Sequence, residues 1–333
     1  MSTVLLSGAS GFLGAHTLVR LLDAGHRVRA FVRTPSKLDA ALRPLGIDDV
    51  EADDRIEVIQ GDMTHAADVQ RAVREVDRVI HAAAIYSFKR SDRDAMLEGN
   101  VQGTRLVLDA AASAGCERIV HVSSTVALNR RGGHVLRHDS PLGEGFGPYS
   151  DSKVASEKVA REAQDAGRPV SIVNPAGVIG PHDPYLGESN AVIQDCVRGK
   201  LTAWPRGSMT YVDVRETADV LVAAVAHEGN GRWLVPGTDV TSPHGAVREA
   251  TGRKLPYVTV PTALAVAATL PGYLTGWKAL PGEVEGARIT GCANPTDASA
   301  TIEALGVRPR PLVDSVRDTL EWLRDASDSG RAS

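Results

Sequence analysis

Cysteine, an excess of basic charge and long hydrophobic runs are all scarce or missing in this sequence of 333 residues. Three widely spaced cysteines, Cys116, Cys196 and Cys292, suit neither a disulfide framework nor a zinc site, so we predict no metal and a reducing compartment, the cytoplasm. The net charge of −4 argues against a nucleic-acid partner. The most apolar late stretch, 258–270, is too short to cross a bilayer and contains a proline, which predicts a buried or interface helix and no transmembrane segment. A strand that begins by residue 3 leaves no room for a signal peptide.

Residues 3–14, TVLLSGASGFLG, are the stretch around which the rest of the chain is organised. Residues 3–6 predict a short buried strand and residues 16–24 predict a helix. Between them, Gly8 permits a tight turn, Gly11 lets backbone approach a phosphate, and Gly14 lets the helix pack on the strand. The helix N-terminus then offers free N–H groups to an anion. The stretch predicts a dinucleotide site, although its spacing differs from G-x-G-x-x-G and an ordinary glycine-rich turn is the alternative.

Strand-like and helix-like segments alternate through the first half of the chain. Strands are expected at 27–32, 56–60, 78–81, 118–123 and 170–173, and helices at 95–114 and 149–166. Gly115 and Gly167 follow the two helices in the position of C-terminal caps. This alternation predicts an α/β fold with a doubly wound parallel sheet, a Rossmann domain that spans 1–180.

After Asn174 the pattern loosens into a region punctuated by proline and glycine. We expect a smaller C-terminal substrate lobe over the carboxyl edge of the sheet, formed by 181–209 and 236–325. Helices are predicted at 190–198, 215–226 and 314–324. The segments 211–214 and 232–235 are expected to return to the main sheet as strands, so that 210–235 belongs to the first domain. A polar tail is expected at 326–333.

The end of the second predicted strand lacks the acidic residue that takes the ribose hydroxyls in NAD-preferring sites. Arg33 stands in its place and Lys37 follows, whereas the first acid is Asp39. A guanidinium suits a 2′-phosphate, so NADP(H) is favoured over NAD(H), with solvation of the two cations as the alternative. Asp62, after the third strand, is expected either to accept from the adenine amino group, with the Met63 backbone beside it, or to cap the helix that follows.

A tyrosine and a lysine four residues apart, Tyr149 and Lys153, begin the helix after the fifth strand and share one helix face. A free phenol has a pKa of about 10, and a neighbouring ammonium favours the phenolate. Tyr149 can then exchange a proton with a carbonyl oxygen while Lys153 lowers its pKa. A hydroxyl to hold the substrate oxygen is expected from Ser123 or Ser124, which end the fifth strand.

Eight motifs in this order resemble an extended short-chain dehydrogenase/reductase from Val4 to about Trp322. They are SGASGFLG (7–14), GDMT (61–64), HAAA (81–84), NVQGT (100–104), VSST (122–125), YSDSK (149–153), NPAGVIGP (174–181) and YVDV (211–214).

The resemblance implies roles for residues in these motifs. It makes Ser124 the donor to the substrate oxygen, with Ser123 as the fallback. It also makes Asn100, on the helix beside the site, a catalytic residue, with an ordinary polar residue at a helix start as the alternative. It assigns the cofactor to residues in and after the first, third, fourth, fifth and sixth strands: Gly8, Ser10, Gly11, Phe12, Leu13, Gly14, Asp62, Met63, Ala82, Ala83, Ala84, Val122, Tyr149, Lys153, Pro175 and Val178.

Two groups within the family are the most similar. The Val-Arg end of the second strand and the 174–181 motif resemble the dihydroflavonol reductase group, which uses NADPH to reduce ketones or aldehydes of hydrophobic substrates. Asn129 falls where that group has a substrate-contacting asparagine, with a solvated loop residue as the alternative. Residues 85–104 and 174–178 also resemble hopanoid-associated sugar epimerases. Sugar-nucleotide epimerases carry an arginine where this chain has Met209, and Arg206 is off-register.

Three functions follow, in this order. The first is NADP(H)-dependent reduction of a hydrophobic carbonyl compound or oxidation of its alcohol. The second is epimerisation or dehydration of a sugar nucleotide with tightly held NAD. The third is a non-catalytic cofactor sensor, although Ser124, Tyr149 and Lys153 are intact. In extended members the helices matching 95–114 and 149–166 pair across a dimer, which leaves a homodimer and a monomer as the two open states.

Overall fold

A parallel sheet of seven strands forms the centre of the computed structural model, which describes residues 1–87, 90–275 and 283–328. The strand order is β10-β6-β5-β4-β1-β2-β3, and each neighbouring pair is parallel. The strands are β1 (Thr3–Ser7), β2 (Arg27–Val32), β3 (Ile56–Gln60), β4 (Arg78–His81), β5 (Arg118–Val122), β6 (Val170–Asn174) and β10 (Arg232–Leu234). The predicted doubly wound Rossmann sheet is confirmed.

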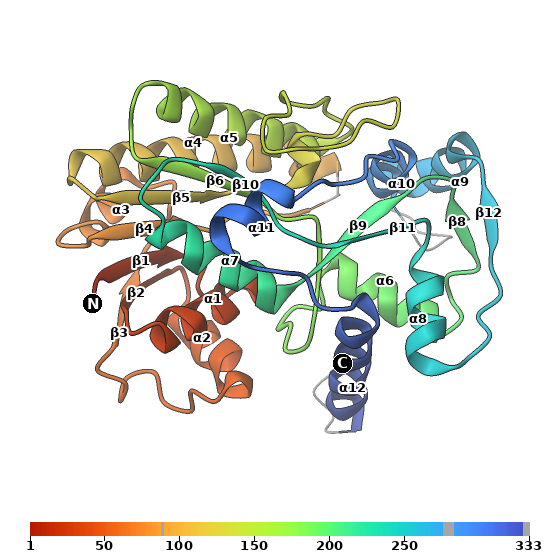
Figure 1. Cartoon of the computed structure of the whole chain (residues 1–333), viewed down its shortest axis with the longest axis horizontal. Helices are drawn as coiled ribbons and strands as arrows, with labels where there is room; N and C mark the ends of the chain where they lie inside the picture. The colour runs from red at the N-terminus through yellow and green to blue at the C-terminus, as the bar shows by residue number, and fades with distance from the viewer. Residues whose placement is uncertain (88–89, 276–282, 329–333) are drawn as a thin grey trace.

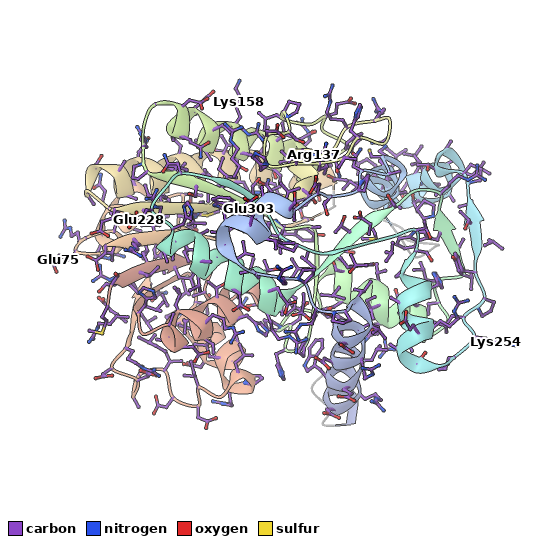
Figure 2. The ribbon with its side chains drawn as sticks, viewed as in Figure 1. Glu75, Arg137, Lys158, Glu228, Lys254 and Glu303 are labelled. Carbon is purple, nitrogen blue, oxygen red and sulfur yellow. The ribbon has the colours of Figure 1, made fainter. Side chains whose placement is uncertain are left out.

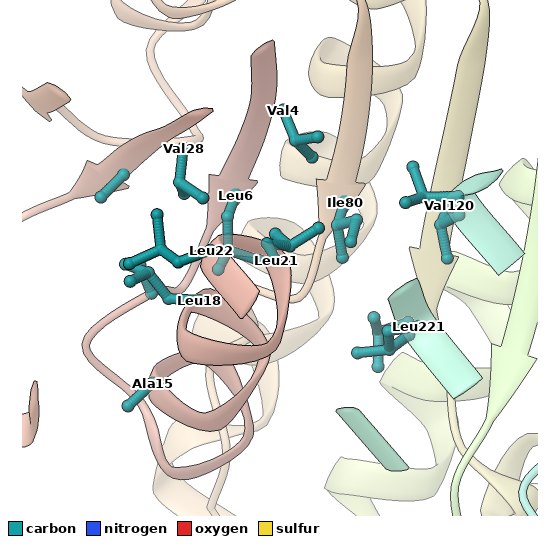
Figure 3. Packing of buried hydrophobic residues seen from close by; sticks show 14 of the residues in the cluster. Val4, Leu6, Ala15, Leu18, Leu21, Leu22, Val28, Ile80, Val120 and Leu221 are labelled. Carbon is teal, nitrogen blue, oxygen red and sulfur yellow. The ribbon is translucent and has the colours of Figure 1, made fainter. Parts of the chain in front are cut away.

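Helices cover both faces of this sheet, because each strand buries side chains on both sides. Val4 and Leu6 of β1 belong to one apolar cluster, while Leu5 between them belongs to the cluster on the opposite face. The first face is covered by α1 (Phe12–Asp23), α2 (Pro35–Leu42) and α7 (Val214–Ala226). The second face is covered by α3 (Ala66–Ala72), α4 (Arg93–Ser113) and α5 (Pro148–Asp165). Figures 1 and 3 show this layering around α1.

The order of the strands reverses beside β1, and this reversal indicates where a ligand-binding site is expected. The chain moves outward from β1 to β2 and β3, then returns to start β4 on the other side of β1. In open α/β sheets a ligand binds beyond the carboxyl ends of the strands at such a reversal. The ends of β1 and β4, at Ser7 and His81, therefore mark the expected crevice.

A second lobe extends from the carboxyl edge of the main sheet (Figure 1). It holds a three-stranded sheet of order β11-β9-β7 and a parallel pair of β12 and β8. Its strands are β7 (Gly177–Ile179), β8 (Ala203–Pro205), β9 (Met209–Asp213), β11 (Thr238–Val240) and β12 (Val258–Val260). The later helices are α6 (Glu188–Val197), α8 (Pro243–Thr251), α9 (Thr262–Thr275), α10 (Val284–Gly291), α11 (Ser299–Leu305) and α12 (Leu312–Asp328). Short 3₁₀ turns are η1 (Arg43–Leu45), η2 (Arg90–Asp92) and η3 (Thr125–Ala127).

Of the two strands expected to return to the main sheet, one joins it and the other does not. The segment 232–234 does return, as β10 beside β6. The prediction for 211–214 is wrong, because β9 pairs with β7 in the three-stranded sheet, with Tyr211 opposite Gly177. The chain leaves the main sheet at Pro175, and β7 beyond it presents an edge on which β9 can form a parallel pair.

The apolar stretch 258–270 is not a buried helix. Its first residues form β12, Pro261 separates them from α9, and none of the residues of α9 is buried. Leu264 and Leu274 are 61% and 56% exposed. In the part of the chain that the structure describes, no helix is long and apolar enough to cross a membrane. The polar tail begins later than expected, because α12 continues to Asp328; residues 329–333 lie outside the described ranges.

Candidate active site

The glycine turn between β1 and α1 has the geometry of an anion cradle. Gly8 has φ +78°, and a Cβ on it would lie 2.8 Å from the backbone nitrogen of Ala83. A Cβ on Gly14 would lie 2.0 Å from the carbonyl oxygen of Gly8, so the first turn of α1 packs directly on the loop. Glycine is therefore required at both positions, as the sequence predicts.

The N-terminus of α1 is open. Gly11 stands at the N-cap position, and no side chain of the described residues caps the helix there. The N–H of Gly11 donates to Gly8 at 2.9 Å, whereas those of Phe12 and Leu13 begin the first turn, where intrahelical acceptors are lacking. Ser10 lies half-buried in the same turn. These groups fit the pyrophosphate of a dinucleotide through backbone donors and the helix dipole.

The segment after β4 forms the opposite wall of this turn. Ala82 and Ala83 donate their N–H groups to Ser7, at its carbonyl oxygen and Oγ, over 3.3 and 3.2 Å. Both alanines are half-buried and Ala84 is exposed. The small side chains leave the turn accessible at the point where β1 and β4 diverge.

The residues expected to hold the adenosine end surround the ends of β2 and β3. Arg33 is exposed, and no described carboxylate lies within ion-pair distance of its guanidinium. The Nζ of Lys37 lies 5.6 Å from the ring centroid of Tyr185, so Lys37 contacts the second lobe. Met63 is buried with its side chain against Gly103 of α4, which leaves only its backbone for a ligand.

The side chain of Asp62 accepts hydrogen bonds from a residue of its own loop. Its Oδ1 accepts hydrogen bonds from the N–H and Oγ1 of Thr64, over 2.9 and 2.7 Å. Burial raises the pKa of Asp62, but these hydrogen bonds and the nearby Arg33 charge outweigh it and hold the pKa below its ordinary value. Asp62 does not cap α3, whose N-cap is His65. Its ionised second oxygen is the one that can accept from an adenine amino group.

Tyr149 and Ser124 meet at the carboxyl edge of β5. Their side chains share a hydrogen bond, and the Oγ of Ser124 also donates to the carbonyl oxygen of Pro175 at 3.3 Å. Ser123 is directed elsewhere, because its Oγ donates to the buried Glu157 at 2.6 Å. Of the two serines, Ser124 is thus the one whose hydroxyl accompanies the phenol.

The pKa of Tyr149 moves in the direction opposite to the one expected. Burial raises the pKa of this phenol to about 12; the hydrogen bond that it shares with Ser124 lowers it and the charge of Glu285 raises it. Lys153, expected to lower it, donates its Nζ to the carbonyl oxygen of Val122 at 3.3 Å. Burial lowers the pKa of Lys153 to about 8, although Glu157 raises it. The protein alone therefore keeps the phenol protonated at neutral pH.

Asn100 is a structural anchor of the site. Its Oδ1 accepts from the N–H of Ile85 at 2.7 Å, and its Nδ2 donates to the carbonyl oxygen of Ile85 at 2.9 Å and to Ser152 at 3.1 Å. The side chain is 3% exposed. It joins the segment after β4 to α4 and α5, so its hydrogen bonds fix the wall of the site.

The remaining predicted residues lie at the ends of β5 and β6. Val122 is buried beneath Lys153, Pro175 is buried under Ser124, and Val178 is half-buried in β7, where it pairs with Val212. Asn129 is 6% exposed, so the alternative of a solvated loop residue is wrong. Met209 begins β9 half-buried, whereas Arg206 is exposed and its backbone is bound to Val260 and Thr262.

Two buried carboxylates were missed by the sequence reasoning. Glu157 lies four residues after Lys153, and it accepts from Ser123, from Asn174 at 2.6 Å and from Arg161. Its helical spacing from Tyr149 and Lys153 is a signal that could have found it. Glu285 of α10 accepts from the backbone of α5. No local pattern marks that contact, because the two segments are 136 residues apart.

Comparison with known proteins identifies the family and the fold of this chain. The sequence matches the NAD dependent epimerase/dehydratase family over residues 4–235. It is 30% identical to sterol demethylase protein B of Methylococcus capsulatus, with 97% of this chain and 98% of that protein covered. It is 28% identical to a putative dihydroflavonol 4-reductase of Synechocystis, over 96% and 94% of the two chains. The solved structure of gox2253 superposes with a TM-score of 0.79 over the full length of both chains, at 26% identity.

Proposed function

We propose that this chain, which belongs to the NAD-dependent epimerase/dehydratase family of extended short-chain dehydrogenase/reductases, is an NADP(H)-dependent oxidoreductase. Its substrate is a ketone or aldehyde of a hydrophobic small molecule, or the corresponding alcohol in the reverse direction. The hydrogen bond between Tyr149 and Ser124 carries this proposal. It joins a proton donor and an oxygen-binding hydroxyl at the sheet edge where the glycine turn can hold a dinucleotide.

The residues divide the chemistry of carbonyl reduction between them. When bound, NADPH supplies the hydride that adds to the carbonyl carbon. The phenol of Tyr149 gives its proton to the carbonyl oxygen, and the hydroxyl of Ser124 donates a hydrogen bond to that same oxygen. Solvent then returns a proton to Tyr149. In alcohol oxidation the same groups act in reverse, and Tyr149 must first lose its proton.

The protonation states of the free protein suit the reductive direction. A Tyr149 phenol with a pKa of about 12 is protonated at pH 7 and ready to donate. Lys153, with a pKa of about 8, is mostly an ammonium at the same pH. That positive charge lies on the same helix face and offsets the negative charge that develops on Tyr149 as the proton leaves.

The preference for NADP(H) is supported by the exposed Arg33. No described carboxylate lies within ion-pair distance of its guanidinium, although the charge of Arg33 reaches Asp62, so the guanidinium can make a forked, charge-assisted contact with a 2′-phosphate. An acid in this place would instead repel that phosphate. Lys37, over the Tyr185 ring, adds a second positive charge on the same side.

The preference for an apolar substrate is supported by the residue at position 209 and by the apolar segment before it. Met209 stands where epimerases carry a diphosphate-binding arginine, and the segment before it packs Leu201 and Trp204 into the lobe. A diphosphate buried without paired cations is very costly, whereas an apolar body gains about 25 cal/mol for each Å² buried. The names of the two relatives above, which refer to a sterol and a dihydroflavonol, are consistent with this class.

A substrate screen tests the proposal. NADPH consumption at 340 nm should appear with hydrophobic aldehydes, ketones or steroid-like carbonyls, and should be much slower with NADH. A UDP-sugar or dTDP-sugar should produce neither epimerisation nor saturable binding. Ring epimerisation without net NADPH consumption would replace the proposal with the sugar-nucleotide function.

A further inference from the structure

A carboxylate from the second lobe caps the helix that carries Tyr149. Glu285 is 1% exposed, and its two oxygens accept hydrogen bonds from the backbone N–H groups of Tyr149 at 3.2 Å and Ser150 at 2.5 Å. The first turn of a helix has N–H groups without intrahelical partners. The N-cap residue of α5 is Gly147, which has no side chain to satisfy them. Glu285 therefore does from α10 what a capping side chain does within its own helix.

The start of α5 is shaped to admit this carboxylate. A Cβ on Gly147 would lie 2.6 Å from Oε2 of Glu285. Gly147 has φ 168°, an extended conformation open to any residue, so proximity to the carboxylate is the reason for glycine here. One helical turn after Glu285, Arg288 donates its Nη1 to the carbonyl oxygen of Phe146 at 2.9 Å. Through these two residues α10 holds the chain on both sides of Gly147.

We propose that Glu285 is a positioning residue: the substrate lobe uses its carboxylate to fix the first turn of α5 and thereby the Tyr149 phenol beside Ser124. This inference rests on the proposed role of Tyr149 as proton donor. A negative charge is also favourable at the positive end of the helix dipole, so the contact is stable where it stands. Because Tyr149 is itself one of the two capped residues, loss of the cap moves the phenol directly.

The charge of Glu285 also acts on the phenol. Burial raises the pKa of Tyr149, Ser124 lowers it, and the Glu285 charge raises it. Burial likewise raises the pKa of Glu285 itself, against hydrogen bonds from Ser150 and Tyr149. The other titratable or charged groups around this helix start are Lys153, Asp151 with its partner Arg93, Tyr86 with its ring centroid 4.6 Å from that of Tyr149, Glu188 and Glu283 near Tyr86, and Arg288.

The first test measures the phenol without any substrate. In protein labelled with 3-fluorotyrosine, the ¹⁹F resonance of Tyr149 is assigned by its loss in Tyr149→Phe and titrated in wild type and in Glu285→Gln. The neutral amide keeps the size of the side chain and removes its charge, so the apparent pKa of residue 149 should fall. Glu303→Gln is the matched control, because Glu303 is exposed on α11 (Figure 2) and should leave that pKa unchanged. An unchanged pKa in Glu285→Gln would overturn the inference.

The second test is a cycle between Gly147 and Glu285, scored by kcat and by KM for NADPH with a substrate found in the screen. Gly147→Ala forces the carboxylate away in the wild-type background, and should lower kcat about 10- to 100-fold, as small misplacements of catalytic groups do. In the Glu285→Ala background the added methyl has room, so Gly147→Ala should have little further effect. KM for NADPH should stay constant, since the glycine turn is separate.

Equal effects of Gly147→Ala in the two backgrounds would contradict the inference. The proposed function fails separately, if Tyr149→Phe retains turnover while the ¹⁹F titration still responds to Glu285→Gln.

Discussion

Ser123 and Ser124 are neighbours in the chain whose hydroxyl groups serve different partners. The Oγ of Ser123 donates to the buried Glu157 at 2.6 Å, and the Oγ of Ser124 shares a hydrogen bond with the side chain of Tyr149. The two consecutive residues at the end of β5 therefore have different roles, one structural and one chemical. One serine ties the strand to α5, and the other stands beside the proton donor.

Alanine at each serine should therefore have a different effect. Ser124→Ala should lower kcat about 10²- to 10³-fold, as loss of an oxygen-binding donor does. It should also cost about 0.5–2 kcal/mol of unfolding free energy, because the Oγ of Ser124 caps η3 by accepting from the N–H of Val126. Ser123→Ala leaves Glu157 with one partner fewer and should cost about 1–3 kcal/mol of unfolding free energy. Steady-state kinetics and urea unfolding of both variants measure the two effects. The assignment fails if Ser123→Ala is the variant that loses turnover.

Cofactor preference should depend on Arg33. Arg33→Asp removes a charge-assisted contact to the 2′-phosphate, which corresponds to about 1.5–3 kcal/mol, and should weaken NADPH binding about 10- to 100-fold. The new carboxylate should also improve NADH binding through the ribose hydroxyls. Fluorescence titration with both cofactors measures the ratio of the two dissociation constants. A wild type that prefers NADH, or a ratio that does not move, rules out this role for Arg33.

Substitution of Glu157 should lower the unfolding free energy more than substitution of an exposed neighbour on α5. The carboxylate is fully buried and accepts from Ser123, Asn174 and Arg161. Glu157→Ala leaves these donors unpaired, and breaking a buried pair in this way costs about 3–5 kcal/mol. Lys158→Ala, at the next position, is the control, because Lys158 is exposed and 4.0 Å from Glu162 (Figure 2). Similar urea midpoints for the two variants would refute the prediction.

The unfolding free energy at acid pH should depend on His121. Both ring nitrogens of this buried histidine lack a hydrogen-bond partner among the described residues, and burial holds its pKa well below 6.5. Below pH 6.5 the unfolded chain therefore binds a proton that the folded protein does not, so stability falls as the pH falls. His121→Phe removes this proton uptake and the unpaired nitrogens. It should raise the unfolding free energy by about 1 kcal/mol at pH 7 and by more at pH 5. If His121→Phe and wild type lose the same amount of unfolding free energy between pH 7 and pH 5, the prediction is wrong.

The sequence alone is sufficient to predict features that depend on the spacing of residues close together in the chain. Gly8 and Gly14 could be predicted because a strand, a turn and a helix follow one another within a few residues. The helix that carries Tyr149 and Lys153 could be predicted from its periodicity. The end of β2 revealed Arg33 because the alternation of buried residues stops there. In each case the deciding contacts are short-range or follow from the parallel sheet.

The features that could not be predicted depend on contacts between distant segments. β9 joins β7 because the chain turns out of the main sheet at Pro175, and no local pattern of 209–213 distinguishes the two sheets. The pKa of Tyr149 was expected to be low because Lys153 shares its helix face, but burial and the distant Glu285 dominate. Neither contribution can be derived from four-residue spacing, since each requires the second lobe to be in place.

Transfer of a proton by Tyr149 is the central claim, and comparison of Tyr149→Phe with wild type tests it most directly. NADPH affinity and single-turnover reduction are measured on both proteins with a carbonyl compound from the screen. We predict an unchanged dissociation constant for NADPH and a reduction rate lower by about 10²- to 10⁴-fold, the usual contribution of a positioned proton donor. A Tyr149→Phe protein that binds NADPH normally and reduces the substrate at a near-normal rate would contradict the account.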